Sequence, residues 1–245
     1  MIRLDATLRD FRHTKSFLEG ILARAADEAG VSLDDLVTET GRERLVLASG
    51  GVPRDYLNLV ASALRRAASG DGVGNRPKNR INAEDVSEVA PEFLAQKEQE
   101  LTLDANPEDV QRLRVRFNDV VNFCVRENQR NVFVVEATKL REEKWGQDLA
   151  ALAELRFLHK IGNLTVKSSS ARFVGRRYEA YVLDLSAHAG SRVRNIEMIE
   201  FWTPAGFQQI RGARFIYVPG DEGPRSRAIA AESGDTEQLE FELVD

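Results

Sequence analysis

The spacing of apolar residues changes partway along the chain, and this change limits the possible folds more than any other feature. Over residues 6–29 apolar side chains recur every three or four positions and Gly30 follows, which predicts an amphipathic helix ending at a glycine. Shorter helical patterns cover residues 32–40 and 41–48. A longer one begins at Pro53, which suits the first turn of a helix.

A further helical pattern covers residues 83–101, and Pro91 within it predicts a break or kink. Asn82 and Asp85 suit the start of this helix, because a side-chain oxygen can accept from its first N–H groups. The chain is therefore predicted to be all helical as far as about residue 100.

Beyond Asn106 the pattern alternates between helix and strand. A helix is predicted over residues 107–128, a β-branched strand over 131–137, and two helices over 139–145 and 147–162. Strands over 163–169 and 178–186 follow, joined by a loop or hairpin tip. Helix, strand, helix, helix, strand, loop, strand is the order of a winged helix-turn-helix domain.

The last part of the chain has weaker patterns. Residues 192–211 read as helical as far as Thr203-Pro204, and residues 214–219 read as a strand. Residues 220–238 are acidic and predicted to be mobile, and residues 237–245 alternate like a strand. The chain carries a net charge of −5, of which residues 221–245 contribute −6. A nucleic-acid site would therefore be a local basic patch on a nearly neutral body.

Composition argues against several classes of protein. No apolar run approaches the roughly 20 residues that a membrane-spanning helix needs, and the charged N-terminus lacks the apolar region of a signal peptide. The single cysteine, Cys124, cannot form an internal disulfide and leaves no spacing for a zinc cluster. We therefore expect a cytoplasmic protein.

The motifs of common enzyme classes do not occur in the sequence. It has no GxxxxGK[ST] phosphate loop, no apolar strand ending in Asp-Glu to hold magnesium, and no GxSxG, HExxH or dinucleotide fingerprint. We therefore expect that this chain alone is not an enzyme, with no catalytic residues, no metal site and no cofactor of its own.

Residues 49–64, SGGVPRDYLNLVASAL, and residues 81–86, INAEDV, carry a resemblance to a known family. Together they resemble the sensor-2 segment and the following helix in the lid of AAA+ ATPases. The closest likeness is to the origin-recognition and cell-division-control initiators and their bacterial relatives. In that family a G-x-P-R-[DE] turn opens a lid helix, and a winged-helix domain follows the lid. The resemblance covers roughly residues 4–188.

The nucleotide-binding core of that family, with its phosphate loop and magnesium-binding acids, is missing from this sequence. The resemblance therefore implies the C-terminal half of such an ATPase, either an excised piece or a split protein whose partner carries the core. ATP and magnesium would bind only with that core present.

By the same resemblance, Arg54 matches the arginine that moves with the lid and reaches the terminal phosphates of ATP. The chemistry is suitable, because a guanidinium forks onto phosphate oxygens and a helix start favours anions. The alternative is that residues 50–53 form an ordinary turn, with Arg54 solvated or paired with Asp55.

A basic stretch marks the predicted wing. Between residues 160 and 177 there are five basic residues and no acid, namely Lys160, Lys167, Arg172, Arg176 and Arg177. Such a wing suits contacts to the phosphates of duplex DNA, with little sequence preference.

The predicted recognition helix, residues 147–162, offers less to DNA. We expect its exposed face to carry Gln147, Asp148, Glu154, Arg156 and His159. These side chains offer few groups that could recognise the bases of DNA. The alternative is that the wing is a solvated hairpin and the domain contacts protein.

Taken together, the patterns predict a mainly α fold, in which a helical AAA+ lid-like bundle precedes an α+β winged helix-turn-helix domain. The expected boundaries are 1–103 for the bundle, 104–189 for the winged helix and 190–245 for a C-terminal extension with an acidic, partly mobile tail. The expected function is a non-catalytic module that couples nucleotide state, through Arg54, to DNA or protein bound by the winged helix. The alternatives are a stand-alone DNA-binding regulator with a helical oligomerisation domain, and an interaction module without nucleic acid.

Overall fold

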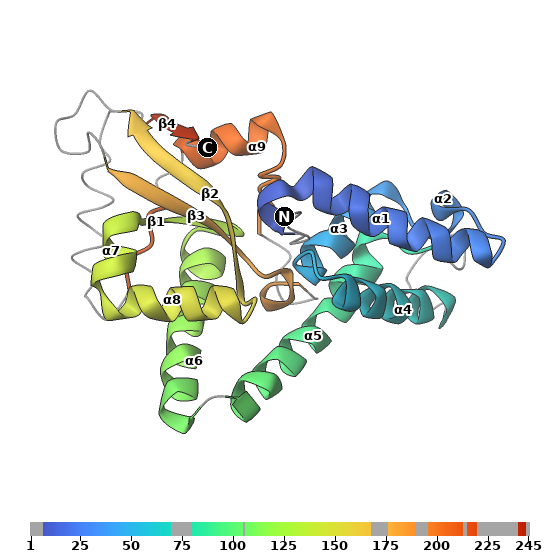
Figure 1. Cartoon of the computed structure of the whole chain (residues 1–245), viewed down its shortest axis with the longest axis horizontal. Helices are drawn as coiled ribbons and strands as arrows, with labels where there is room; N and C mark the ends of the chain where they lie inside the picture. The colour runs from blue at the N-terminus through green and yellow to red at the C-terminus, as the bar shows by residue number, and fades with distance from the viewer. Residues whose placement is uncertain are drawn as a thin grey trace, which may run out of the picture. The chain divides into compact units, whose positions relative to one another are not determined.

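The computed structural model describes residues 7–69, 80–104, 106–167, 176–189, 196–212, 215–219 and 240–243 (Figure 1). These residues are mainly helical and include a four-stranded antiparallel sheet, in agreement with the predicted combination of helical bundle and α+β region. Within these ranges no helix is long and apolar enough to cross a lipid bilayer.

The chain divides into two compact units. The first spans residues 1–96 and 184–194, and the second spans residues 97–183 and 195–245. In chain order the helices of the first unit are η1 (Leu8–Asp10), α1 (Phe11–Glu28), α2 (Leu33–Leu36), α3 (Glu39–Ser49), α4 (Pro53–Ser69), the first part of α5 (Ala83–Asp104), and η3 (Leu185–Ala187).

Side-chain caps fix where the helices of the first unit begin. Asp10 accepts a hydrogen bond from the His13 N–H at the start of α1. Ser32 and Thr38 cap α2 and α3 in the same way, through the third residue beyond each cap. α4 begins at Pro53, as the sequence predicts.

A short parallel contact joins the loop before α3 to the loop before α5. Val37 pairs with Ile81 in an isolated parallel bridge. Ile81 N–H donates to the Leu36 carbonyl and Thr38 N–H donates to the Ile81 carbonyl, both at 2.9 Å. Gly41 packs closely on this contact, because a Cβ there would lie 3.0 Å from the Ile81 carbonyl oxygen.

α5 begins at a reciprocal cap and continues through its proline. Asn82 Oδ1 accepts from Asp85 N–H at 3.1 Å, and Asp85 Oδ2 accepts from Asn82 N–H at 2.9 Å. Of the break or kink predicted at Pro91, the break is wrong, since the helix runs unbroken from residue 83 to 104. A proline inside a helix costs about 3 kcal/mol, and the burial of Val89 and Ala90 just before it offsets part of this cost.

In the second unit, helices and strands alternate. Their order is the second part of α5, α6 (Pro107–Val121), the π-helical turn η2 (Asn122–Glu127), β1 (Val132–Glu136), α7 (Ala137–Glu142), α8 (Lys144–Glu154), β2 (Leu158–Lys167), β3 (Arg177–Leu183), α9 (Pro204–Gly212) and β4 (Glu240–Leu243).

The strands form one sheet in the order β1-β3-β2-β4, with each neighbouring pair antiparallel. β3 is flanked on both sides, so that Ala180 pairs with Val134 of β1 and with Gly162 of β2. The register of β2 shifts between Lys160 and Gly162. α6, α7 and α8 lie on one side of the sheet in Figure 1, and between them is a buried core that includes Leu113, Phe117, Phe133, Leu149, Leu152 and Phe157.

Segments from the C-terminal region pair with both outer strands of the β1-β3-β2 sheet. Residues 215–217 run parallel to β1, where Val134 N–H donates to the Phe215 carbonyl and Tyr217 N–H donates to the Val134 carbonyl, both at 2.8 Å. β4 pairs with β2 on the opposite side. The structure thus places strand-like pairing within two stretches predicted as strands, residues 214–219 and 237–245.

The predicted helix over residues 147–162 is wrong in its second half. α8 ends at Glu154, and β2 begins at Leu158. Arg156 turns the chain with a φ of 63°, in the left-handed region where a helix ends. Apolar residues recur at a spacing of three from Leu149 to Ile161. This spacing is helical only in its first part, because Leu158 and Ile161 lie in β2.

The prediction for residues 192–211 is also wrong for its described first part. Residues 196–203 are not helical, and α9 starts at Pro204, where the helix was expected to end. Thr203 Oγ1 accepts from Gly206 N–H at 3.0 Å and caps this helix. The Thr-Pro pair is a start signal, with the cap directly before a proline in the first position.

Candidate functional site

A tight turn of two glycines places Arg54. Gly50 has a φ of 58° and Gly51 a φ of 86°, a region that residues with a side chain rarely adopt. Val52 N–H donates to the Ser49 carbonyl at 3.1 Å across the turn. Because of this turn, α4 starts four residues after α3 ends, and Arg54 is its second residue.

The Arg54 side chain is 69% exposed, and its Nε lies 3.3 Å from Asp55 Oδ1. An exposed ion pair of this kind contributes little, at most about 1 kcal/mol. This contact is the one expected if Arg54 is merely paired with its neighbour. It uses only Nε, however, so the two terminal nitrogens make no hydrogen bond or ion pair within the described part of the chain.

Arg54 shares one face of α4 with other exposed residues. Leu57 is 40% exposed, and Ala61 and Arg65 are exposed as well. These residues lie three, seven and eleven positions after Arg54, which puts all of them on the same face of a helix. The opposite face, with Tyr56 and Leu59, is fully buried.

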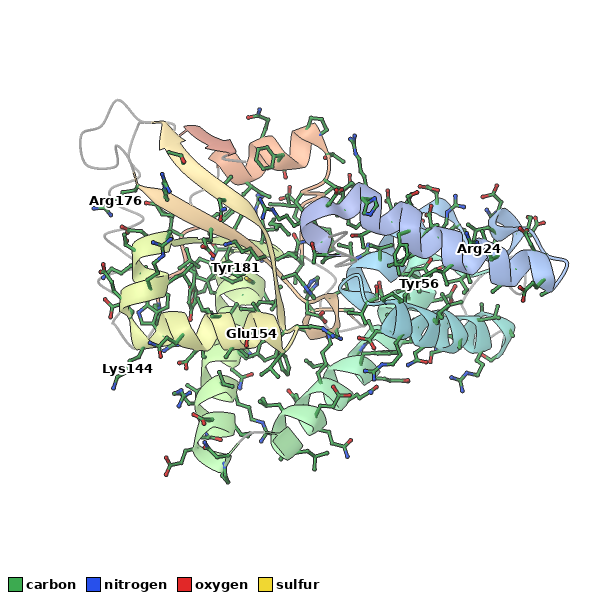
Figure 2. The ribbon with its side chains drawn as sticks, in the orientation of Figure 1. Arg24, Tyr56, Lys144, Glu154, Arg176 and Tyr181 are labelled. Carbon is green, nitrogen blue, oxygen red and sulfur yellow. The ribbon has the colours of Figure 1, made fainter. Side chains whose placement is uncertain are left out.

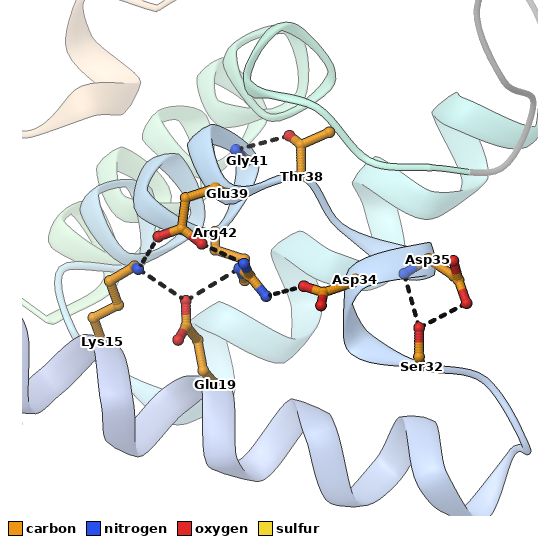
Figure 3. Close-up of polar contacts among 9 residues, drawn as sticks. All are labelled: Lys15, Glu19, Ser32, Asp34, Asp35, Thr38, Glu39, Gly41 and Arg42. Carbon is orange, nitrogen blue, oxygen red and sulfur yellow. Dashed lines mark hydrogen bonds and ion pairs between the residues drawn. The ribbon is translucent and has the colours of Figure 1, made fainter.

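An ion-pair cluster joins α1, α2 and α3 in the first unit (Figure 3). We call it the Arg42 cluster, and it consists of Lys15, Glu19, Asp34, Glu39 and Arg42. Arg42 Nη1 lies 2.9 Å from Asp34 Oδ1, and Arg42 Nε lies 3.4 Å from Glu19 Oε1. Glu39 accepts hydrogen bonds from both Lys15 and Arg42.

The two cations change how Glu39 ionises. The hydrogen bond from Lys15, followed by the one from Arg42, lowers the pKa of the Glu39 carboxyl below its ordinary value. The sequence shows only the local pairs, Lys15 with Glu19 and Glu39 with Arg42, at helical spacing. It does not show that α1 and α3 bring these pairs together, and the cluster was not predicted.

In the second unit, a buried carboxylate anchors α8 to α6. Asp148 Oδ1 accepts from Arg112 Nε at 2.8 Å, and Asp148 Oδ2 lies 3.8 Å from Arg116 Nε. The prediction that Asp148 and His159 belong to an exposed helical face is wrong, since both are buried and His159 lies in β2.

The exposed positions of α8 are therefore fewer than expected. They include Gln147 and Glu154, together with Lys144 and Ala150. Figure 2 shows Lys144 and Glu154 near the two ends of this helix. One cation, one carboxylate and one amide give the face little net charge and few groups for reading bases.

Carboxylates from neighbouring strands meet two of the five predicted DNA-binding residues. Lys160 Nζ lies 2.7 Å from Glu179 Oε2, and Arg176 Nη1 lies 3.1 Å from Glu136 Oε2. The absence of acids between residues 160 and 177 therefore does not leave this region purely basic. Cross-strand pairing supplies the negative charges, a relation that the linear sequence does not display.

Two more of the predicted basic residues, Lys167 and Arg177, lie near one end of the β2–β3 pair. Arg177 is exposed and pairs in register with Thr165, and Lys167 is the last residue of β2. Arg172 lies outside the described residues. Lys160 is seven residues before Lys167 along β2, so the structure does not gather the described cations at one point.

No protein-family model matches this sequence, and no curated protein and no solved structure shows significant similarity to it. Any inference about the function of this chain therefore rests on its own sequence and geometry.

Proposed function

We propose that the first unit is the lid of an AAA+ type ATPase, in which Arg54 contacts the phosphates of a nucleotide held by a separate core. The observation that carries this proposal is the position of Arg54. Its side chain is 69% exposed, shortly after a double-glycine turn and in the first turn of a 17-residue helix. The core would be supplied by the same protein or by a partner chain.

The surroundings of Arg54 suit an anion. The first turn of a helix leaves N–H groups without intrahelical partners, and the helix dipole favours negative charge there. The two terminal nitrogens can fork onto phosphate oxygens while Asp55 stays beside Nε. Asp55 repels an incoming phosphate, so the contact requires further positive charge from magnesium or from the core.

Leu57 supports a partner surface around Arg54. This leucine is 40% exposed one turn after the arginine, on the same face of the helix. An apolar side chain beside an exposed guanidinium resembles the composition of interfaces, where arginine and large apolar residues are enriched.

The second unit would act as a winged helix. The order of α6, β1, α7, α8, β2 and β3, together with the sheet order β1-β3-β2, supports this proposal. α7 and α8 would form the helix-turn-helix, and the connection between β2 and β3 would form the wing. In the assembly this unit would engage DNA or protein in response to the nucleotide.

One observation favours a protein partner for the second unit. The pairing of Lys160 with Glu179 and of Arg176 with Glu136 reduces the positive charge that duplex DNA requires. A stand-alone DNA-binding regulator would need that charge in full. The interaction module without nucleic acid is therefore the second candidate function.

The nucleotide contact is tested in an assembly that includes the ATPase core, whether that core is in the same polypeptide or in another chain. We expect Arg54→Ala to lower ATP turnover about 10- to 100-fold, the range for a lost hydrogen bond to a charged group. Arg54→Lys should recover only part of the activity, because an ammonium cannot fork. Arg65→Ala, exposed on the same face of α4, is the matched control and should keep full turnover. Full turnover in folded Arg54→Ala would refute the nucleotide contact.

The second unit is tested by the anisotropy of fluorescent duplex DNA at about 50 and 200 mM salt. If DNA is the ligand, combined replacement of Arg172, Arg176 and Arg177 by alanine should abolish a salt-sensitive binding signal. Arg24→Ala, exposed on α1 of the first unit, is the control for loss of a positive charge. Absence of binding by the unmodified chain at low salt would leave the protein-binding function as the assignment.

A further inference from the structure

Three buried polar atoms on helices α1, α3 and α4 make no hydrogen bond to any described protein atom. They are the hydroxyl oxygen of Tyr56, Oε1 of Glu19 and Nε of Arg42. They come from three helices, α4, α1 and α3, that pack on one another. Buried polar groups are nearly always hydrogen-bonded to protein or to an ordered water molecule, so three such atoms in one small unit require an explanation.

The two charged groups also affect the ionisation of the tyrosine. Burial raises the pKa of the Tyr56 phenol, the Glu19 carboxylate raises it further, and the Arg42 guanidinium opposes both. Tyr56 is fully buried, and Figure 2 shows it on α4 with the α1 and α3 ribbons alongside. The three buried atoms therefore lie in the interior of the first unit, where α1, α3 and α4 pack together.

Direct contacts between these residues leave the three atoms without a hydrogen bond. Arg42 Nε lies 3.4 Å from Glu19 Oε1, but the two atoms form an ion pair without hydrogen-bond geometry. Lys15 Nζ lies 3.3 Å from the same oxygen, again without a hydrogen bond. The carboxylate oxygen can still accept, and the guanidinium N–H and the phenol can still donate.

We propose that one ordered water molecule binds between Tyr56, Glu19 and Arg42. The water accepts hydrogen bonds from the Tyr56 hydroxyl and from Arg42 Nε, and it donates one to Glu19 Oε1. Three partners are the usual number for a buried water. In this arrangement each of the three protein atoms gains one hydrogen-bond partner, and no proton moves.

The site links the Arg42 cluster to the start of α4. Tyr56 is two residues after Arg54, in the same helical turn. A bound water thus connects α1 and α3 to the turn that carries the exposed arginine. The inference concerns the interior of the first unit and does not depend on the proposed nucleotide contact.

The decisive variant is Tyr56→Phe, measured by thermal unfolding of the full chain. An unsatisfied buried hydroxyl destabilises the folded state, so its removal would raise Tm or leave it unchanged. A hydroxyl bonded to water stabilises it, so we expect Tm to fall by about 2 to 8 °C. An unchanged or higher Tm would overturn the proposal.

A double-mutant cycle adds the second partner. If one water serves both residues, Tyr56→Phe should lower Tm less in a Glu19→Ala background than in the unmodified chain. Additive shifts would contradict a shared water. Arg24→Ala in α1 provides the control background, in which the effect of Tyr56→Phe should be unchanged.

A crystal structure of the unmodified chain separates a bridging water from a direct bond. We expect one water within hydrogen-bond distance of all three atoms. A Tyr56 hydroxyl bonded directly to the Glu19 carboxylate would overturn the proposal even if Tm falls in Tyr56→Phe.

Discussion

The hydroxyl of Tyr217 donates a 2.6 Å hydrogen bond to Asp119 Oδ2, and so joins residues that lie 98 positions apart in the sequence. Burial, followed by this bond, raises the pKa of the Tyr217 phenol. The ring packs edge-on against Phe123, Phe133 and Trp145. Residues 215–219 are thus part of the core of the second unit rather than an appendage to it.

Removing the Tyr217 hydroxyl should destabilise the second unit. We expect Tyr217→Phe to lower the free energy of unfolding by about 1.5 to 3 kcal/mol, because the bond is to a charged carboxylate. Tyr217→Ala should cost more, about 3 to 5 kcal/mol, since it also leaves a cavity among the aromatic rings. Urea unfolding measures both losses. Equal losses in the two variants would show that the packing of the ring contributes nothing beyond the hydrogen bond of the hydroxyl.

The Asp148–Arg112 pair should respond unequally to removal of its two partners. The Asp148 side chain is 6% exposed and the Arg112 side chain 56%. We expect Asp148→Ala to cost about 1 to 3 kcal/mol, because it removes the buried group that fixes α8 on α6. Arg112→Ala should cost less than about 1 kcal/mol, since an exposed partner contributes little and Arg116 stays near the carboxylate. Equal losses in chemical denaturation would be inconsistent with this geometry.

Glu39 should make the first unit sensitive to acid. Its pKa is lowered in the folded state by Lys15 and Arg42, so its stabilising contribution is present above the unfolded pKa, about 4.3. That contribution is lost as the pH falls through the lower, folded pKa. We expect the Tm difference between the unmodified chain and Glu39→Gln to shrink between about pH 5 and pH 3. Glu92→Gln, on the exposed face of α5, is the control for loss of one carboxylate, and identical pH profiles in the two variants would exclude the effect.

The two glycines at the α3–α4 turn should not tolerate a side chain. At Gly50, with a φ of 58°, alanine costs about 1 to 2 kcal/mol because its Cβ disfavours the left-handed region. Gly20 in α1 has nothing within 4 Å of an added Cβ, so Gly20→Ala should stabilise the chain by about 0.5 to 1 kcal/mol. Thermal unfolding compares the pair. If Gly50→Ala instead stabilised the chain, residue 50 would not need the left-handed conformation in the folded protein.

Local signals in the sequence predicted most element starts correctly. Pro53 and Asn106 mark the starts of α4 and α6, and Gly30 follows the end of α1 with a φ of 72°. These signals work because caps and positive φ depend on the residue itself and on its near neighbours.

Where the outcome depended on distant residues, the sequence was misleading or silent. The leucine spacing across Arg156 looked helical, but the chain turns there, Phe157 is buried, and Leu158 begins β2. The basic stretch looked unopposed until β1 and β3 brought Glu136 and Glu179 beside it.

The Arg42 cluster could not be predicted for the same reason. Each of its local pairs is visible at helical spacing, but the packing of α1 on α3 decides which pairs meet. The position of Arg54 in the first turn of α4 could be predicted, because the glycines and the proline before it act locally. Its nucleotide contact remains a prediction.

The pairing on both sides of the β1-β3-β2 sheet also affects how chains meet one another. An open strand edge offers unpaired N–H and C=O groups that strands from other molecules can join, which is a route to aggregation. Here the Phe215–Tyr217 segment occupies the β1 edge and β4 occupies the β2 edge. If the chain is shortened before residue 215, both edges lose these partners, and insolubility is then expected even where the helices remain folded.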